Sequence, residues 1–206
     1  FREERARKDI GERISAAFDE TLAWAQKDIR TALPVKHVVE NIELSKFPVT
    51  DQELAEAREL IRQLEQQKLP ENMTPEEKLA LASSKNSWLK RHQSTIERYE
   101  DQKKNPKVPM ELHVVKVGDI AFASNRFELY MDYMHRIQAR SPFEQTFIVQ
   151  LAGTPGAKGG TYLPTSRSVA NRGYGSVLPS CDVSPEGGQE LVDETVKILK
   201  EIYPSK

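Results

Sequence analysis

The sequence predicts an α/β fold, or an α+β fold, in which helices pack on a mixed sheet of few strands and a helical hairpin is inserted between strands. Two apolar runs, Asp119 to Ala123 and Thr146 to Leu151, flank a helical segment of about a dozen residues, as in a βαβ unit. Apolar residues at helical spacing mark a helix at each end of the chain. The highly charged segment 48–107 carries two helix-start signals and accounts for the hairpin.

Length and charge restrict the classes of protein. With 206 residues the chain can form one domain, and its formal charge of −1 offers no electrostatic basis for binding nucleic acid. No apolar run approaches the ~20 residues of a transmembrane helix. The chain begins at Phe1 without methionine or an apolar signal region, so we expect a signal peptide or upstream domain to have been removed or left out. The single cysteine, Cys181, excludes an intrachain disulfide and is expected to be a small, half-buried side chain rather than a reactive thiol.

The first third of the chain predicts a helix and then a strand. The helix covers residues 1–31 and ends before Pro34, because the residue before a proline is disfavoured in the α conformation. Residues 35–47 alternate in polarity and predict a strand with Ile42 and Leu44 on one face. The apolar stripe of the helix consists of Ile10, Ile14, Ala17, Phe18, Leu22 and Ala25.

The inserted hairpin is defined by two capping boxes. Thr50-Asp-Gln-Glu53 predicts a helix that runs to about residue 68, and Thr74-Pro-Glu-Glu77 predicts one that runs to about residue 102. In each box the threonine accepts a hydrogen bond from a free backbone N–H, and the glutamate side chain accepts one from the backbone N–H of the cap. The buried side of the second helix is expected to consist of Trp88, Leu89, Ile96 and Tyr99.

The last hundred residues predict the sheet and its crossover. Residues 110–117 form a strand, and Gly118-Asp119 is a tight turn into the run that ends at Ala123. A helix over 126–140 and a strand over 146–151 follow, and then a long loop extends to residue 183. Ser184-Pro185 caps a final helix whose apolar stripe consists of Leu191, Val192, Val196, Leu199 and Ile202.

Five short segments in this region carry a family resemblance. In order they are Gly118-Asp-Ile-Ala, Glu128, Gln150-Leu-Ala, Tyr162-Leu-Pro-Thr and Gly173-Tyr174. From about Lys116 to the C-terminus the chain resembles the last part of the catalytic domain of the neutral/alkaline, non-lysosomal ceramidases, zinc amidases that cleave N-acyl sphingoid bases. The resemblance implies that Glu128 and Tyr162 are the two late zinc ligands, that Tyr174 is a nearby site tyrosine, and that two histidine ligands belong to a missing N-terminal part.

The chain also departs from the family at two points. A Pro-Gly pair usually precedes the glutamate in the family, whereas this chain has Arg126 and Phe127. The glycine before the ligand tyrosine is replaced by Thr161, and glycines stand immediately upstream at 159 and 160. A bulky Phe127 beside the ligand is expected to affect how closely the backbone approaches a metal.

Other interpretations of these residues stay open at the sequence level. Glu128 near a helix start is also typical of a surface carboxylate that complements the helix dipole. Glu128, Asp132 and His135 share one helix face and form either a local metal cluster or, as we prefer, a solvated face.

Arg167 and Arg172 flank the tyrosine segment, and we assign Arg172 with Tyr174 as catalytic candidates. The glycine-rich stretch 153–160 lacks the final G-K-[ST] of a phosphate loop, which favours a site loop. The remaining histidines lack ligand spacing and are expected to be structural or exposed: His37, His92 and His113.

These observations lead to one functional hypothesis and one alternative. The chain is expected to be a single domain, 1–206, forming the C-terminal portion of a ceramidase-like zinc-dependent amidase that hydrolyses an N-acyl amide bond and is inactive alone. The resemblance implies zinc as cofactor, a lipid-like N-acyl amide as substrate, the N-terminal part of the same protein as partner, and a secreted, periplasmic or cell-surface location. The alternative is a non-catalytic binding module or a diverged member without a zinc site.

Overall fold

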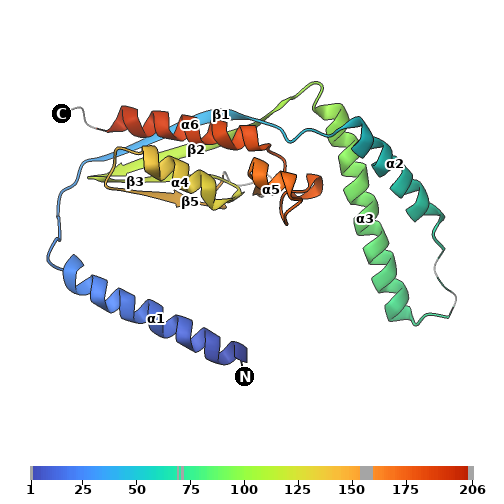
Figure 1. Ribbon diagram of the computed structural model, residues 1–206, viewed down its shortest axis with the longest axis horizontal. Helices are drawn as coiled ribbons and strands as arrows, with labels where there is room; N and C mark the ends of the chain where they lie inside the picture. Colours follow the sequence, from blue (N-terminus) through green and yellow to red (C-terminus); the bar gives the residue numbers. More distant parts are fainter. Residues whose placement is uncertain (1, 69, 71, 154–159, 204–206) are drawn as a thin grey trace. The chain divides into compact units, whose positions relative to one another are not determined.

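A mixed sheet of four strands in the order β1-β2-β3-β5 organises the main body of the protein (Figure 1). In this computed structural model, which describes residues 2–68, 70, 72–153 and 160–203, the strands are β1 (Val35–Ser45), β2 (Lys107–Val117), β3 (Ile120–Ser124) and β5 (Gln145–Val149). The first three pair antiparallel, and β3 pairs parallel with β5. The α/β class is therefore confirmed.

The predicted βαβ unit is present and is built from β3, α4 (Met131–Arg140) and β5. The Gly118-Asp119 turn joins β2 to β3, and Gly118 has a φ of 63°. Glycine adopts this left-handed conformation without steric cost, which suits a two-residue hairpin turn.

β2 begins three residues before the expected Met110 and contains Pro109. Pro109 is the register partner of Glu43 on β1, whereas β3 pairs only with Val114–Val117 of β2. At Pro109 the second side of β2 is therefore an edge, where a residue without a backbone N–H is tolerated.

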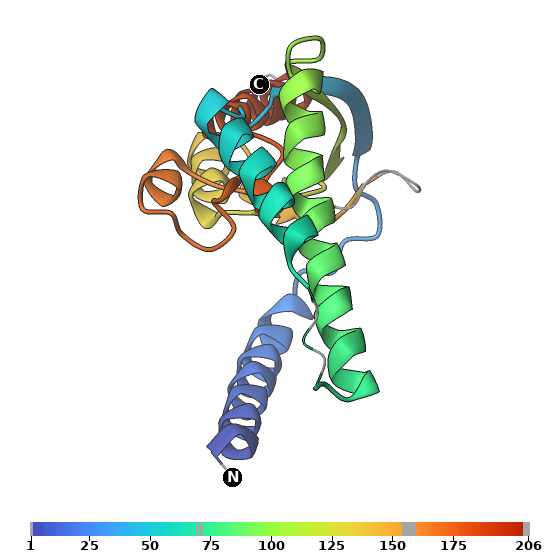
Figure 2. The same ribbon diagram turned by 90° about the vertical axis from the view of Figure 1, so that its right-hand side faces the viewer.

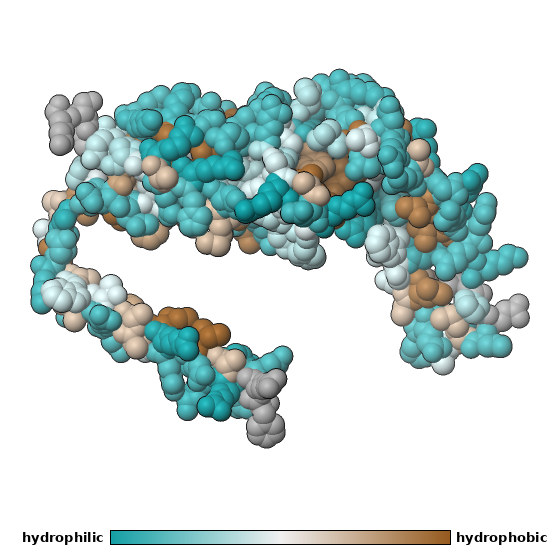
Figure 3. Space-filling model, in the orientation of Figure 1, coloured by the Kyte–Doolittle hydropathy of each residue, from teal (hydrophilic) through white to brown (hydrophobic). Residues whose placement is uncertain are grey.

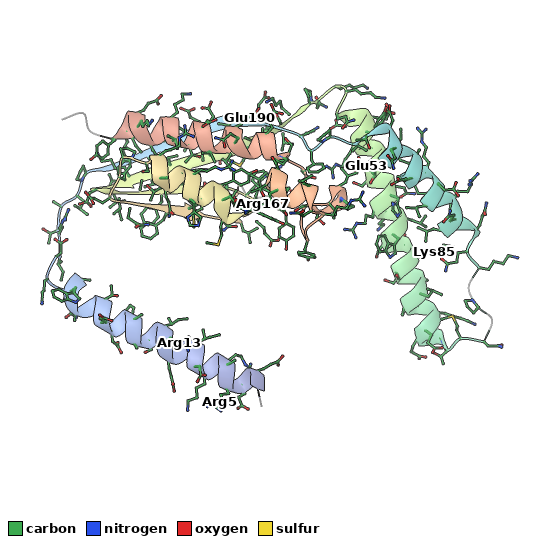
Figure 4. The ribbon with its side chains drawn as sticks, in the orientation of Figure 1. Arg5, Arg13, Glu53, Lys85, Arg167 and Glu190 are labelled. Carbon is green, nitrogen blue, oxygen red and sulfur yellow. The ribbon has the colours of Figure 1, made fainter. Side chains whose placement is uncertain are left out.

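One face of the sheet is covered by α4 and by α6 (Pro185–Ile202) (Figure 1). Ser184 caps α6 by accepting a hydrogen bond from Gly187 N at 3.2 Å, as predicted. Glu190 of α6 accepts hydrogen bonds from Ser45 N at 2.7 Å and from Lys107 Nζ at 2.5 Å, which ties the helix to β1 and β2 (Figure 4). The core between these layers includes Leu44, Leu112, Val114, Ala121, Phe127, Tyr133, Leu191, Val192, Val196 and Leu199.

The opposite face of the sheet carries half-buried and exposed side chains. Phe122 and Phe147, which are register partners, stack with ring centroids 5.0 Å apart. Val39 and Val149 are exposed on this face. The sheet of this unit is therefore asymmetric, with one face packed against helices and one face that the described residues of the same unit leave open.

The hairpin α2 (Asp51–Gln66) and α3 (Pro75–Asp101) is inserted between β1 and β2, and both capping boxes are present. Figure 2 shows the two helices side by side. Arg98 of α3 donates to Leu178 O at 2.5 Å and to Cys181 O at 2.8 Å, which anchors the base of the hairpin. The expectation that Trp88 is buried is wrong, because it lies beside the buried face and remains 47% exposed against His92.

Residues before Val35 form a separate compact unit, Phe1–Pro34, whose helix is α1 (Arg2–Ala25). The helix ends at Ala25 rather than at residue 31, and the residues from Gln26 to Pro34 that follow it are exposed. Its apolar stripe is exposed (Figure 3), and consists of Ile10, Ile14, Phe18 and Leu22. In the described part of the chain, none of the helices is long and apolar enough to cross a membrane.

Two expectations for the C-terminal half are corrected. The helix predicted over 126–140 begins only at Met131, and Glu128 lies on the short strand β4 (Glu128–Leu129). The long loop expected up to residue 183 contains β6 (Tyr162–Leu163), α5 (Ser166–Ala170) and the 3₁₀ turn η1 (Leu178–Ser180). Most of the glycine-rich stretch 153–160 lies outside the described residues.

Candidate functional site

The candidate site lies where the chain leaves the carboxyl ends of β3 and β5. Asn125 N donates to Val149 O at 2.9 Å, and Ala152 N donates to Asn125 O at 2.9 Å. Backbone hydrogen bonds therefore join the two segments that follow β3 and β5. Ligand sites of open α/β sheets lie beyond the carboxyl ends of parallel strands. Glu128 and the segment that leads into Tyr162 follow β3 and β5 in the chain and lie in this region.

Glu128 and Tyr162 are register partners in a two-stranded parallel ladder made of β4 and β6. Glu128 N donates to Thr161 O at 3.1 Å, and Tyr130 N donates to Leu163 O at 3.3 Å, which fixes this register. Register partners on neighbouring strands project to the same face. The ladder therefore brings the two side chains together, although residues 128 and 162 are 34 positions apart in the sequence.

The two side chains interact directly. A hydrogen bond from the Tyr162 hydroxyl to the Glu128 carboxylate is the largest cause that raises the pKa of Tyr162 to about 12, followed by a hydrogen bond with Tyr174. A neighbouring carboxylate disfavours a phenolate. Tyr162 is therefore a neutral phenol at neutral pH, with its proton directed at Glu128.

The orientation of Glu128 follows from its neighbours in sequence. Phe127 is fully buried and Leu129 is 6% exposed, so alternation along β4 turns Glu128 to the opposite face. Asn125 Oδ1 accepts from Phe127 N at 3.0 Å, and Gln150 Oε1 accepts from Leu129 N at 2.6 Å. The bulky Phe127 therefore packs in the core, while two side-chain amides hold the backbone on both sides of the carboxylate.

Gly160, two residues before Tyr162, lies where two backbone segments approach each other closely. A Cβ atom at this position would lie 1.6 Å from the carbonyl oxygen of Arg126. Any other residue would push the β6 segment away from the segment that leads into β4. The glycine therefore permits the close backbone approach on which the ladder depends.

A tight turn over residues 173–176 places Tyr174 against Tyr162. The ring centroids are 5.5 Å apart with an angle of 70° between planes, and Tyr174 is 86% exposed. Gly175 has a φ of 77°, and a Cβ atom there would lie 2.6 Å from Cγ of Tyr162. The turn thus packs directly on the Tyr162 ring and leaves the Tyr174 hydroxyl accessible.

A cluster of hydroxyl groups holds this turn. The Tyr130 hydroxyl donates to Tyr174 O and lies 3.0 Å from Ser176 Oγ. Ser168 Oγ donates to the Tyr130 hydroxyl at 3.2 Å and also contacts Ser176 Oγ. Sequence reasoning did not identify Tyr130, Ser168 or Ser176, because none belongs to a motif and only the fold brings them together.

Arg172, the other catalytic candidate, lines a cavity to which the carboxylate–phenol pair does not contribute. It has a φ of 49° and lines a cavity of ≈ 1060 Å³ formed with α2 and the end of α5; Glu128 and Tyr162 are not among the lining residues. Arg167 of α5 forms an ion pair with Asp132 of α4 at 3.2 Å (Figure 4). Because Glu128 precedes α4 and Asp132 is paired with Arg167, the helix-face arrangement of Glu128, Asp132 and His135 is not present.

The pair fits part of a zinc site. Carboxylate oxygen is an ordinary zinc ligand, and most protein zinc sites also contain nitrogen or sulfur. Within the ranges 2–68, 72–153 and 160–203, no group of three or more His, Cys, Asp or Glu side chains could hold a metal ion. Cys181 offers no thiolate, because its side chain is buried and this burial is the main cause that raises its pKa to about 12. The donor set therefore requires further ligands from outside these residues.

Comparisons of the chain with protein-family models, with curated proteins and with solved structures find no match.

Proposed function

We propose that this chain is the C-terminal portion of a zinc-dependent amidase that resembles the neutral/alkaline ceramidases and hydrolyses an N-acyl amide bond. The observation that supports the proposal is the Glu128–Tyr162 pair, which the β4–β6 ladder holds beyond the carboxyl ends of β3 and β5. This pair joins two of the five segments that carry the family resemblance. A third, Gly173-Tyr174, lies directly against it.

In the intact protein, Glu128 and Tyr162 would hold the zinc ion together with two histidines from an upstream segment. A bound zinc ion supplies hydroxide near neutral pH and polarises the amide carbonyl. For both oxygens to face one cation, Tyr162 must give up the proton that it now donates to Glu128. We therefore expect zinc uptake to release a proton, as is usual for ligands that bind in their deprotonated form.

Tyr174 is assigned to substrate contact. Its side chain is 86% exposed, and its ring meets Tyr162 edge-on. A phenolic O–H at this position can donate a hydrogen bond to an oxygen of the acyl amide or of its polar headgroup. Arg172 lines the cavity beside α2, where its guanidinium could contact a polar headgroup.

The proposal includes a partner and a location. Two oxygen donors alone form a weak zinc site, so the upstream part of the same protein is the required partner, and this chain by itself is inactive. The substrate is a lipid-like N-acyl amide. A secreted, periplasmic or cell-surface location follows from the resemblance.

A second candidate function is a non-catalytic binding module. The observation that favours it is that the Tyr162 hydroxyl already has the Glu128 carboxylate as its hydrogen-bond partner. Metal analysis of the full-length protein distinguishes the two functions. We expect the zinc content to fall by about one ion per chain in Glu128→Ala and to be unchanged in the control Glu144→Ala, whose carboxylate is exposed elsewhere. Full-length protein without zinc would favour the binding module.

A further inference from the structure

Two histidines that are 76 residues apart in sequence meet on the open face of the sheet. His37 on β1 is the register partner of Val115 on β2, and His113 on β2 is the register partner of Val39 on β1. The two rings are therefore diagonal neighbours on the face opposite to α4 and α6. His37 Nε2 lies 3.0 Å from His113 Nδ1, with 23° between the ring planes.

Glu111 fixes the hydrogen-bonding roles of the two rings. His113 Nε2 lies 2.8 Å from Glu111 Oε1 and donates its proton to that carboxylate. When His113 is neutral, its Nδ1 then carries a lone pair and accepts from His37 Nε2–H. The two facing nitrogens thus share a single proton, with a carboxylate behind the second ring.

We propose that His37 and His113 bind a divalent transition-metal ion of the Zn²⁺, Ni²⁺ or Cu²⁺ class between these two nitrogens. Imidazole nitrogen is a preferred ligand of these ions. Metal–nitrogen distances of about 2.0–2.1 Å allow two nitrogens 3.0 Å apart to bind one ion at roughly a right angle once the rings pivot. His37 then moves its proton to Nδ1, so both rings remain neutral and no net proton is lost.

Glu111 acts on the ion through His113. A carboxylate that accepts a hydrogen bond from the outer nitrogen of a ligating histidine fixes the ring and increases its basicity. His37 is exposed, and the side chains of His113 and Glu111 are 37% and 33% exposed, so an ion and its water ligands can reach the pair. In the described part of the chain no third His, Cys, Asp or Glu joins them, and water completes the coordination.

This site is separate from the carboxylate–phenol pair. It is built on β1 and β2, whereas Glu128 and Tyr162 lie beyond β3 and β5. Its donors are two nitrogens held by an antiparallel ladder of eleven register pairs, Val35↔Val117 to Ser45↔Lys107. The His37–His113 site and the proposed amidase site can therefore be tested independently.

Isothermal titration of the untagged chain with Zn²⁺ and with Ni²⁺ tests the proposal. We expect one equivalent to bind to the wild-type chain. His37→Ala and His113→Ala should each weaken binding by tenfold or more, with no binding to the double variant. Glu111→Gln should weaken it by about 10- to 100-fold. The other two histidines provide matched controls, so His92→Ala and His135→Ala should bind as the wild type does, as should Glu128→Ala.

Ni²⁺ broadening of the histidine ring signals in the NMR spectrum of the wild-type chain gives a second readout that needs no variant. The signals of His37 and His113 should broaden before those of His92 and His135. The proposal is overturned if the wild-type chain binds neither ion, if the double variant binds as well as the wild type, or if His92 and His135 broaden first.

Discussion

The Tyr162 hydroxyl donates a hydrogen bond to the Glu128 carboxylate, and the two residues are partners in a parallel ladder of two residues per strand. Such a short ladder has little stability of its own. It is held by Asn125 and Gln150 on the β4 side and by the Gly175 turn against the Tyr162 ring. The geometry of the pair therefore depends on its supporting contacts, and each of these contacts can be tested.

Removing the carboxylate should lower the pKa of Tyr162. The hydrogen bond to Glu128 is the largest cause that raises this pKa to about 12, so in Glu128→Ala the value should move toward the ordinary 10.0. Site-resolved tyrosine titration by NMR measures the shift. Tyr133 is a control, because burial rather than Glu128 is the main cause that raises its pKa to about 12, and it should not move.

The same pKa gives a dependence of stability on pH. A phenol whose folded pKa is raised from 10.0 to about 12 stabilises the folded state below pH 10, and this contribution is lost between pH 10 and about pH 12. Glu128→Ala should therefore reduce the alkaline loss of stability. Equal loss in the two proteins would show that the pair does not contribute.

Gly175→Ala should displace Tyr162. The added methyl would lie 2.6 Å from Cγ of that ring, at a φ of 77° that costs a non-glycine residue about 1–2 kcal/mol. We expect a lower unfolding midpoint and a Tyr162 pKa closer to its ordinary value. Gly11→Ala is the control, because a methyl there meets nothing within 4 Å and lies in a helix.

Leu199→Ala should destabilise the main unit by about 2–4 kcal/mol, the usual cost of truncating a buried leucine. Leu199 lies on α6 and is fully buried in the core. Urea denaturation monitored by circular dichroism gives the free energy of unfolding. Leu79→Ala, at a position that is 72% exposed, should change it by less than about 0.5 kcal/mol. Similar effects at both positions would contradict the docking of α6.

Glu190→Gln should weaken the attachment of α6 to the sheet in a pH-dependent way. Burial raises the pKa of Glu190, but hydrogen bonds from Lys107 and Ser45 outweigh it, so the folded pKa is below its ordinary value. The carboxylate therefore stabilises the fold above its unfolded pKa, and this contribution is lost as pH falls. The wild type should exceed the variant in stability at pH 7 and approach it at pH 3. Glu194→Gln, which removes only a surface pair with Lys197, should show little change at either pH.

Much of the fold could be predicted because the signals are local. Both capping boxes lie within four residues, and the Gly118-Asp119 turn joins adjacent strands. The parallel pairing of β3 and β5 followed from two apolar runs around one helix. These features depend on backbone conformation and short spacing, which the sequence displays directly.

The rest depends on distant contacts. The sequence of residues 126–130 predicts a helix, yet Glu128 lies on a strand, because Glu128 N donates to Thr161 O and Tyr130 N donates to Leu163 O. Trp88 has the spacing of a buried residue but lies beside the face that meets α2. The His37–His113 pair shows no ligand spacing in sequence, because strand register alone brings the rings together.

The most direct test of the proposed function is the rate of amide hydrolysis by the full-length protein. With N-acyl sphingosine as substrate, we expect Glu128→Ala to reduce the rate by about 100-fold or more, since a displaced ligand leaves the reactive water badly placed. Tyr162→Phe should reduce the rate and leave the fold intact, whereas Glu144→Ala should match the wild type. Full activity of Glu128→Ala would contradict the assignment of Glu128 and Tyr162 to a catalytic zinc site.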